Sequence, residues 1–345
     1  MITIDGSAGE GGGQSLRTAV ALALCERRPC RIVNIRARRP KPGLRPQHLA
    51  AVRAAAEISG AEIRGASVNA RELTFVPGDI KPGSYRFAIG TAGSTSLVLQ
   101  TVLPALLTAS ADSELLLEGG THNPRAPTFD FLARAYLPLI ERMGPRIAIE
   151  LERVAFEPAG GGRVRVRVVP AAQLEALHLE ARGAVQRLEA EVLLSKLPRH
   201  IAERETAVLA QGLDLGPASV RLRLVDDSPG PGNAVSVFAV CEGLTEVFTA
   251  FGRRGVPAES VAEAAVGAAK HYLSAGAPVS VHLADQLLLP FAVAGAGSFV
   301  TMPPSRHTLT NIEVIQRFLP LTVECHPAEG SGAWRVAVPQ GPRDA

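Results

Sequence analysis

A short motif recurs in this chain 81 residues apart, and each copy leads into an apolar segment with helical character. The two copies are residues 12–16 (GGQSL) and residues 93–97 (GSTSL). A second pair of matching segments, residues 41–44 and 123–126, is separated by 82 residues. Two landmarks at nearly the same offset indicate a duplicated structural unit. The duplication constrains the fold strongly, because both copies must form the same elements in the same order.

The apolar runs between these landmarks define the repeating unit. The first copy is predicted to contain strands at residues 1–4, 30–35, 62–66 and 72–76 and helices at residues 15–25 and 47–59. The second copy is predicted to contain strands at residues 85–89, 113–117 and 146–151 and helices at residues 98–107 and 128–143. The unit is therefore strand-helix-strand-helix-strand-strand, an α/β (α+β) arrangement in which two helices cover each sheet.

A third copy is predicted to start at the glycines 160–162, with a strand at residues 163–169 and helices only at residues 285–294 and 311–318. This interruption predicts that residues 181–275 form an inserted, smaller α/β domain. Residues 1–180 and 276–345 then form a large domain of three tandem units. The insert is predicted to contain strands at residues 186–194, 219–224 and 235–241 and helices at residues 198–211 and 257–274. Within it, residues 227–233 (DSPGPGN) are predicted to be an exposed linker.

No feature of the sequence indicates a membrane or secreted protein. The N-terminus lacks a secretory signal, and no apolar run is long enough to span a bilayer. The four cysteines, at positions 25, 30, 241 and 325, have no metal-ligand spacing. Cys25 and Cys30 could form a disulfide, but reduced thiols are the favoured interpretation. We therefore expect a cytoplasmic protein without a membrane partner, and the sequence indicates no oligomeric state.

The net charge is only +3, but basic residues crowd between positions 27 and 45. The eight basic residues in this stretch are Arg27, Arg28, Arg31, Arg36, Arg38, Arg39, Lys41 and Arg45. They could bind a phosphate backbone, or they could belong to a solvated loop. Because only 4% of the residues are aromatic, a base-stacking platform is not expected.

The first glycine motif follows an acidic residue in the loop of residues 5–13 (DGSAGEGGG). Backbone N–H groups at the start of a helix attract anions such as phosphate, yet Glu10 would repel one. A carboxylate at this place is explained if a divalent cation lies between it and the phosphate. The alternative is a tight structural turn that binds no ligand.

Among the eight histidines, His307 lies in the most polar surroundings. It belongs to residues 303–311 (PPSRHTLTN), in which Thr310 or Asn311 is predicted to cap the following helix. Most lone histidines are structural. A neutral imidazole at such a junction can instead act as an acid, a base or a nucleophile.

Together with further motifs, these features resemble the RNA 3'-terminal phosphate cyclases, the bacterial enzymes in particular. The motifs are EGGGQ at residues 10–14, RPKPGL at 39–44, GST at 93–95, GGT at 119–121, HLADQ at 282–286, and His307 with the Thr-Asn pair at 310–311. They occur in order along essentially the whole chain, so the combination is specific although each motif is weak alone. The eukaryotic ribosome-assembly relatives are expected to lack the nucleophilic histidine, which is present here as His307.

The resemblance implies an ATP-dependent reaction in three steps. His307 attacks the α-phosphorus of ATP, forms a covalent histidine–AMP and releases pyrophosphate. AMP then passes to the 3'-phosphate of an RNA end, and the neighbouring 2'-hydroxyl finally displaces AMP to leave a 2',3'-cyclic phosphate. The implied substrates are ATP and RNA 3'-phosphate ends, the implied metal is Mg²⁺ or Mn²⁺, and the implied role is RNA end processing or repair.

The resemblance also implies roles for particular residues. Glu10 matches a metal-contacting carboxylate. The residues that match nucleotide-binding positions are Gln14, Gln100, Pro127, His282, Leu283, Ala284, Asp285 and Gln286. The residues that match RNA- or phosphate-binding positions are Arg17, Arg36, Arg39, Gln47 and His48. One departure is His282, because the bacterial relatives carry tyrosine there; histidine can still stack on adenine with a smaller ring.

Two other functions fit parts of the sequence. Enolpyruvyl transferases are also built from repeated units with two helices on a sheet, but they need no covalent nucleotide. A non-catalytic RNA-binding assembly factor would keep the basic surface and have no reaction to lose. Self-labelling by ATP at His307 distinguishes both from the cyclase.

Overall fold

The computed structural model describes residues 1–330 and 332–339, and its first unit contains the predicted elements in the predicted order. They are β1 (Ile2–Asp5), α1 (Gln14–Glu26), β2 (Cys30–Val33), α2 (Pro46–Ser59), β3 (Glu62–Arg64) and β4 (Leu73–Val76). The sheet has the order β1-β2-β4-β3; β1 and β2 are parallel, and the other pairs are antiparallel. The β–α–β connection places α1 and α2 on one face of this sheet.

The second unit repeats this topology. Its elements are β5 (Ser84–Ala88), α3 (Thr95–Leu106), β6 (Ser113–Gly119), α4 (Phe129–Phe131), the π-helical turn η1 (Leu132–Tyr136), α5 (Leu137–Glu141), β7 (Arg146–Arg153) and β8 (Gly162–Val169). The order β5-β6-β8-β7 corresponds strand for strand to that of the first sheet.

The prediction that residues 163–169 begin the third unit is wrong, because β8 completes the second. Val166 pairs with Leu115 of β6 on one side and with Ile149 of β7 on the other. The valines at alternate positions of β8 are buried under α3, while its arginines face outward and pair with acids of β6 and β7. Burial of one strand face thus fixes β8 in this sheet.

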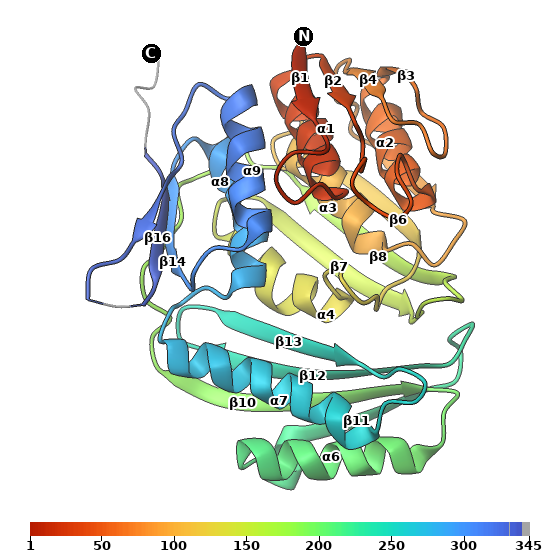
Figure 1. The fold of residues 1–345 in the computed structure, drawn as a ribbon, viewed down its shortest axis with the longest axis vertical. Helices are drawn as coiled ribbons and strands as arrows, with labels where there is room; N and C mark the ends of the chain where they lie inside the picture. The colour runs from red at the N-terminus through yellow and green to blue at the C-terminus, as the bar shows by residue number, and fades with distance from the viewer. Residues whose placement is uncertain (331, 340–345) are drawn as a thin grey trace.

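The third unit begins with the short strand β9 (His178–Leu179) and continues only after the insert. Its later elements are α8 (Val281–Ala294), β14 (Gly297–Thr301), α9 (Arg306–Phe318), β15 (Glu324–Pro327) and β16 (Trp334–Val338). The sheet order β15-β16-β14-β9 again matches the other two, so three tandem units are confirmed. Helices α1, α3, α8 and α9 pack together between the three sheets (Figure 1).

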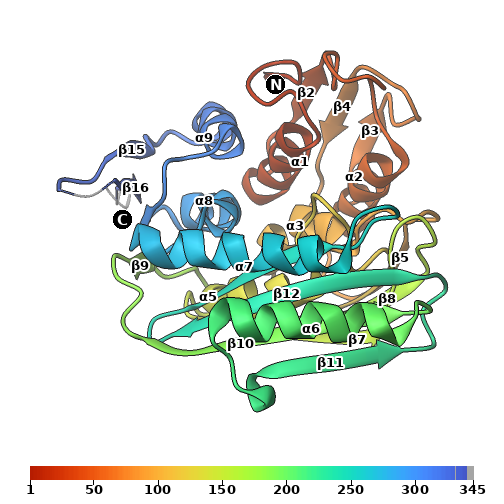
Figure 2. The same cartoon turned by 60° about the horizontal axis from the view of Figure 1, so that its bottom comes forward.

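The residues between β9 and α8 form a sheet of their own. It contains β10 (Val185–Ser195), β11 (Val220–Val225), β12 (Gly232–Cys241) and β13 (Thr245–Phe251), in the order β11-β10-β12-β13. Helices α6 (Arg199–Leu213) and α7 (Ala258–Ala275) lie side by side on one face of this sheet, as Figure 2 shows, and a 3₁₀ turn, η2 (Pro217–Ser219), precedes β11. Strand β13 was not predicted. The division into an insert of residues 181–275 and a large domain of residues 1–180 and 276–345 remains a prediction.

The expectation that residues 227–233 form an exposed linker is wrong for part of the segment. Ser228 and Asn233 are buried, and the carbonyl of Gly230 accepts hydrogen bonds from Ser195 Oγ (3.2 Å) and Ser228 Oγ (3.1 Å). These contacts hold the turn between β11 and β12 against the sheet.

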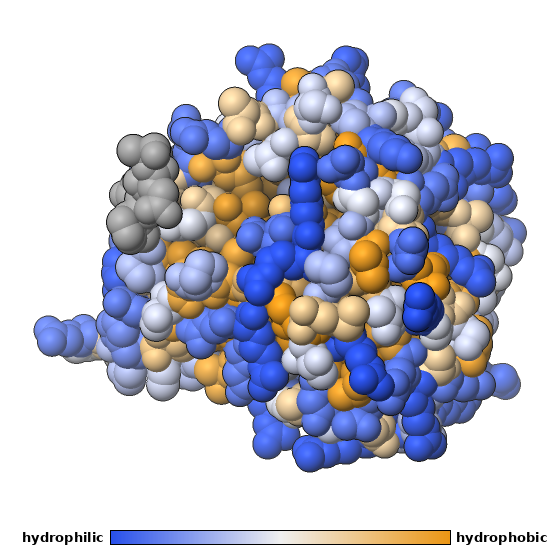
Figure 3. All heavy atoms as spheres, turned by 90° about the horizontal axis from the view of Figure 1, so that it is seen from above, coloured by the Kyte–Doolittle hydropathy of each residue, from blue (hydrophilic) through white to orange (hydrophobic). Residues whose placement is uncertain are grey.

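The cysteines are unpaired, and the surface mixes hydrophobic and hydrophilic residues (Figure 3). All four cysteines are free. Among the described residues, no helix is long and apolar enough to cross a membrane. Seen from above in Figure 3, hydrophobic residues lie in small groups between hydrophilic ones.

Candidate active site

The glycine loop between β1 and α1 is held against the first turn of α9. Gly9 has a φ of +57°, and a Cβ added there would lie 2.2 Å from Thr310 Oγ1, so only glycine fits without displacing Thr310. The next backbone N–H, that of Glu10, donates to the same Thr310 hydroxyl at 3.0 Å. The loop is thereby fixed close to His307, although about 300 residues separate them in the sequence.

His307 lies in the first turn of α9, and the prediction that Thr310 or Asn311 caps this helix is wrong. The helix starts at Arg306, and Ser305 caps it, because its Oγ accepts from Thr308 N at 3.0 Å. Because the helix starts before the predicted position, the His307 imidazole lies at the positive end of the helix dipole, where a phosphate is favoured. The side chain is 45% exposed, and it lines the pocket described below.

Asp285 sets the position of this turn. Its Oδ1 accepts from Ser305 Oγ at 2.9 Å and also from Thr308 Oγ1, and burial raises its pKa against the opposing effect of these hydrogen bonds. Its carbonyl accepts from Asn311 Nδ2 at 3.2 Å. Asp285 was predicted to contact the nucleotide and it lines the pocket; its carboxylate also joins α8 to α9.

Glu10 lies between the His307 imidazole and the Arg39 guanidinium. Its Oε2 is 3.8 Å from His307 Nδ1, and its other oxygen forms an ion pair with Arg39. Arg39 Nη2 also donates to the Glu10 carbonyl at 3.1 Å. Both Glu10 Oε2 and His307 Nδ1 are buried atoms without a hydrogen-bond partner among the described residues. Such a pair of unsatisfied atoms is costly unless a ligand or ion completes it.

Two basic residues lie behind the glycine loop. Arg17, on α1, lines the pocket; burial lowers its pKa to about 10, so it stays a cation at neutral pH. His48 is buried, and its pKa falls to about 3, mainly by burial and then by the charges of Arg17, Arg36 and Arg45. Its Nδ1 accepts from the Arg45 N–H at 3.1 Å, so the neutral ring carries its proton on Nε2.

The Nε2 of His48 faces the glycine loop. A Cβ added to Gly13 would lie 2.2 Å from it. His48 is therefore a neutral hydrogen-bond donor beside the start of α1 over the whole physiological pH range.

Of the five predicted RNA-binding residues only Arg17 lines the pocket; Arg36, Arg39, Gln47 and His48 do not. Arg36 donates to the carbonyls of Lys41 (2.7 Å) and Gly43 (3.2 Å), so it braces its own loop. Gln47 lies in the first turn of α2, beside Gly93.

The predicted nucleotide-binding residues divide into two groups. Gln100 of α3 donates a hydrogen bond to Gln286 of α8, and both line the pocket together with Gln14, Pro127 and the exposed His282. Leu283 and Ala284 are fully buried in the core on the other side of α8, so their side chains do not face the pocket.

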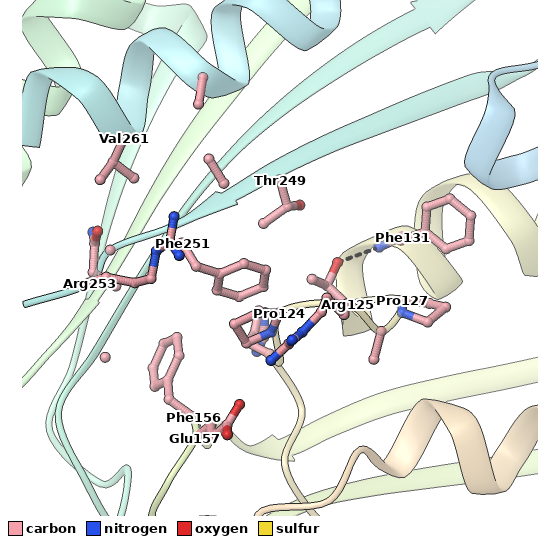
Figure 4. A pocket seen from close by; sticks show the side chains of 18 of the residues that line it. Pro124, Arg125, Pro127, Phe131, Phe156, Glu157, Thr249, Phe251, Arg253 and Val261 are labelled. Atoms are coloured by element: carbon pink, nitrogen blue, oxygen red, sulfur yellow. Dashed lines mark hydrogen bonds between the residues drawn. The ribbon is translucent and has the colours of Figure 1, made fainter. Parts of the chain in front are cut away.

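One large pocket of about 1570 Å³ is lined by the site residues Gln14, Arg17, Gln100, Pro127, His282, Asp285, Gln286 and His307. It lies where the first turns of α1, α3, α8 and α9 meet, and it extends to the insert. Figure 4 shows the part formed by the loop before α4 and by the insert. Four helix N-termini give the pocket a positive potential suited to phosphate groups. Among the described residues, no group of three or more His, Cys, Asp and Glu side chains could hold a metal alone.

One polar network in the pocket wall was not predicted. His122 is buried, and its Nε2 lies 3.0 Å from Asp130 Oδ2. Burial would raise the pKa of Asp130, but the hydrogen bond and charge of His122, together with the charges of Arg223 and Arg134, hold it below the usual value. His122 directly follows the GGT motif of residues 119–121, and this position next to a motif is the sequence feature that could have identified it.

The crowded basic stretch does not form a single surface. Arg27 pairs with Asp79 and Arg31 with Glu72, while Arg28 donates to the Phe318 carbonyl, all near the C-terminal end of α1. Arg39 lies at the opposite, N-terminal end, where it pairs with Glu10. The interpretation of the whole stretch as one phosphate-backbone footprint is therefore wrong, and only its later part borders the site.

Comparison with known proteins gives one consistent result. A family model described as RNA 3'-terminal phosphate cyclase matches residues 8–325. The chain is 51% identical over 338 residues to a protein named RNA 3'-terminal phosphate cyclase from Koribacter versatilis, covering 98% of this chain and 95% of that protein. Proteins of the same name from Ralstonia nicotianae and Salmonella typhimurium are 50% and 47% identical, over 98% of this chain and 97% and 99% of theirs.

Proposed function

This chain belongs to the RNA 3'-terminal phosphate cyclase family, and we propose that it converts the 3'-terminal phosphate of RNA to a 2',3'-cyclic phosphate with ATP through a covalent His307–AMP intermediate. The observation that carries the proposal is the environment of His307. Its imidazole is partly exposed to a large, positively polarised pocket, and one ring nitrogen faces the Glu10 carboxylate at 3.8 Å.

The Glu10 carboxylate selects which nitrogen of His307 reacts. A negative charge beside Nδ1 favours the tautomer with its proton on Nδ1, so the lone pair lies on Nε2. Nε2 forms a bond to the α-phosphorus of ATP, the bond from this phosphorus to the bridging oxygen breaks, and pyrophosphate leaves. The imidazole then carries a positive charge, which Glu10 stabilises.

The remaining groups in and behind the pocket position and neutralise phosphates. Arg17 supplies a fixed positive charge, and His48 supplies a neutral N–H donor beside the glycine loop. The N-terminal turns of α1 and α9 add backbone dipoles. Gln100 and Gln286, which hydrogen-bond to each other across the pocket, lie where amide groups can bind the nucleotide.

The later steps need positioning more than further functional groups. An oxygen of the RNA 3'-phosphate attacks the phosphorus of the AMP, and the bond to His307 Nε2 breaks. The 2'-hydroxyl of the same ribose then attacks the 3'-phosphorus and AMP leaves. Because this hydroxyl belongs to the same nucleotide, its effective concentration is already high.

A divalent metal fits this site at Glu10. Glu10 Oε2 is a buried oxygen without a partner among the described residues, and Mg²⁺ or Mn²⁺ is commonly held by one or two carboxylates together with substrate phosphates. Such an ion would neutralise phosphate charge next to the glycine loop. Arg39 shares the same carboxylate and would keep Glu10 oriented.

End-group analysis tests the proposal. A 3'-phosphorylated oligonucleotide incubated with the protein, ATP and Mg²⁺ should acquire an end that resists phosphatase. His307→Ala should abolish this product, whereas His271→Ala, at an exposed position of α7 outside the pocket, should not. A phosphatase-sensitive end in every reaction would favour a non-catalytic RNA-binding role, and transfer of an enolpyruvyl group without labelling by ATP would favour a transferase.

A further inference from the structure

The pocket continues well beyond the residues proposed to hold ATP and the terminal phosphate. Its volume of about 1570 Å³ exceeds the roughly 300–1,000 Å³ of sites that hold one small ligand. The additional space lies between the loop before α4 and the insert, where α6, the end of β13 and the start of α7 form the wall. Of the residues predicted to bind the nucleotide, Pro127 alone lies in the loop that borders this part (Figure 4).

Cations without partners lie at the mouth of this part. Arg125 precedes α4, and Arg253 and Arg254 follow β13; all three side chains are exposed and line the pocket. None of the three guanidinium groups makes a hydrogen bond or an ion pair with any residue between positions 1 and 330 or 332 and 339. In contrast, the neighbouring Arg204 is neutralised by a two-pronged pair with Glu259.

Acidic groups offset this charge only partly. Glu157 is exposed at the mouth. Glu205 is fully buried in the wall, and burial raises its pKa to about 7 against a hydrogen bond from Asn233 at 2.8 Å, so it carries a reduced negative charge at neutral pH. The mouth therefore keeps an excess of positive charge.

Apolar surface lies among the cations. In the view of Figure 4 the Phe251 ring lies between Arg253 on one side and Pro124 with Arg125 on the other. Phe251 is half-buried and packs against a small cluster that includes Phe156, which fixes its ring. A fixed aromatic ring flanked by arginines suits single-stranded nucleic acid, whose bases stack and whose phosphates pair with cations.

We propose that this face, defined as Arg125, Phe251, Arg253 and Arg254, binds the RNA strand upstream of its 3'-terminal nucleotide. The inference rests on the proposed function, which places the terminal phosphate at Arg17 and His307. A strand that ends there must leave through the same pocket, and the insert forms its other wall. An acidic protein segment would fit the charge, but it would not explain the continuity with a site for an RNA end.

The test compares a long and a short substrate in the double variant Arg253→Ala/Arg254→Ala. The long substrate is a twelve-nucleotide RNA with a 3'-phosphate, and the short one is a dinucleotide with a 3'-phosphate, which has only one nucleotide upstream of its terminal one. We expect the ratio of the long-substrate KM to the short-substrate KM to rise about tenfold at low salt. Two lost phosphate contacts should also reduce the slope of log KM against log salt by about 1.4 for the long RNA.

A charge-matched control separates this face from net charge. Arg146→Ala/Arg199→Ala removes two exposed arginines outside the pocket and should leave both the ratio and the slope at the wild-type values. An unchanged ratio in the Arg253→Ala/Arg254→Ala protein, including the case in which the face serves an acidic protein, would overturn the proposal. An equal loss in the control would also overturn it.

A binding assay with an RNA that lacks a 3'-phosphate tests the strand-binding face independently of the proposed cyclisation. Fluorescence anisotropy with a labelled twelve-nucleotide RNA that ends in a 3'-hydroxyl requires no reaction. About tenfold weaker binding by Arg253→Ala/Arg254→Ala supports the strand-binding face even if no cyclic phosphate ever forms. Equal binding by the variant and the wild type refutes the face even if cyclisation is observed.

Discussion

Asp285 offers a direct test of how the fold positions the nucleophile. Its Oδ1 accepts from both Ser305 and Thr308, and these residues start the helix that carries His307. Asp285→Ala removes this acceptor and leaves the Thr308 hydroxyl, in a fully buried side chain, with only Ser305 as a partner. Hydrogen bonds to a charged acceptor contribute about 1.5–3 kcal/mol each. Release of the buried carboxylate offsets part of this loss, so we expect destabilisation by about 3 kcal/mol.

The functional effect follows from the same geometry. A shift of about 1 Å in the first turn of α9 should slow attack by His307 about 100-fold. The assay is single-turnover labelling of the protein with α-labelled ATP, with urea unfolding in parallel to measure the free energy of unfolding.

Asp285→Asn is the matched control, because both hydrogen bonds go to Oδ1 and an amide oxygen can accept them. We expect it to lose less than about 1 kcal/mol and to label within about tenfold of the wild-type rate. Near-wild-type stability and labelling of Asp285→Ala would refute the reasoning. If Asp285→Asn were as impaired as Asp285→Ala, the charge of Asp285 and not its acceptor geometry would be essential.

Three further predictions concern the glycine loop and its neighbours. The pKa of His48 is about 3 in the fold and about 6.5 when unfolded, so protonation favours the unfolded chain; stability should fall by about 1.4 kcal/mol per pH unit as the pH drops below about 6.5. His48→Gln should lack this contribution in urea unfolding at pH 7, 6 and 5, and an identical pH slope in both proteins would argue against it. Gly9→Ala should destabilise by at least about 1–2 kcal/mol in the same assay, because of its φ of +57° and the contact with Thr310; a change below about 0.5 kcal/mol would contradict this. Glu10→Gln should raise the Mg²⁺ or Mn²⁺ concentration for half-maximal labelling about tenfold, and an unchanged requirement would remove Glu10 as the metal contact.

The repeated architecture could be predicted because its signals are local. The glycine motifs mark the starts of α1 and α3, which begin at Gln14 and Thr95, again 81 residues apart. The assignment of β8 failed because the sequence does not show which sheet an alternating strand joins. Pairing of Val166 with both Leu115 and Ile149 decides this, and these contacts are distant in sequence.

The sequence indicates several residues that the structure brings to one pocket, but not the contacts that connect them. Gln14, Arg17, Gln100, His282 and His307 do meet in one pocket. The contacts that organise them join loops and helices that are separated in the sequence, and no motif marks such pairs. Examples are Glu10 with Arg39, Glu10 with Thr310, and Asp285 with Ser305. The capping residue of α9 was misplaced for the same reason, since Ser305 is fixed by a carboxylate from another helix.

The most direct test of the account is the site of labelling by α-labelled ATP. The protein should acquire one label per chain that is stable in alkali and labile in acid, and peptide mapping should place it on His307. His307→Ala should remain folded and take up no label. Label on another residue, undiminished label in His307→Ala, or ATP-dependent formation of a cyclic end by His307→Ala would contradict the central claim.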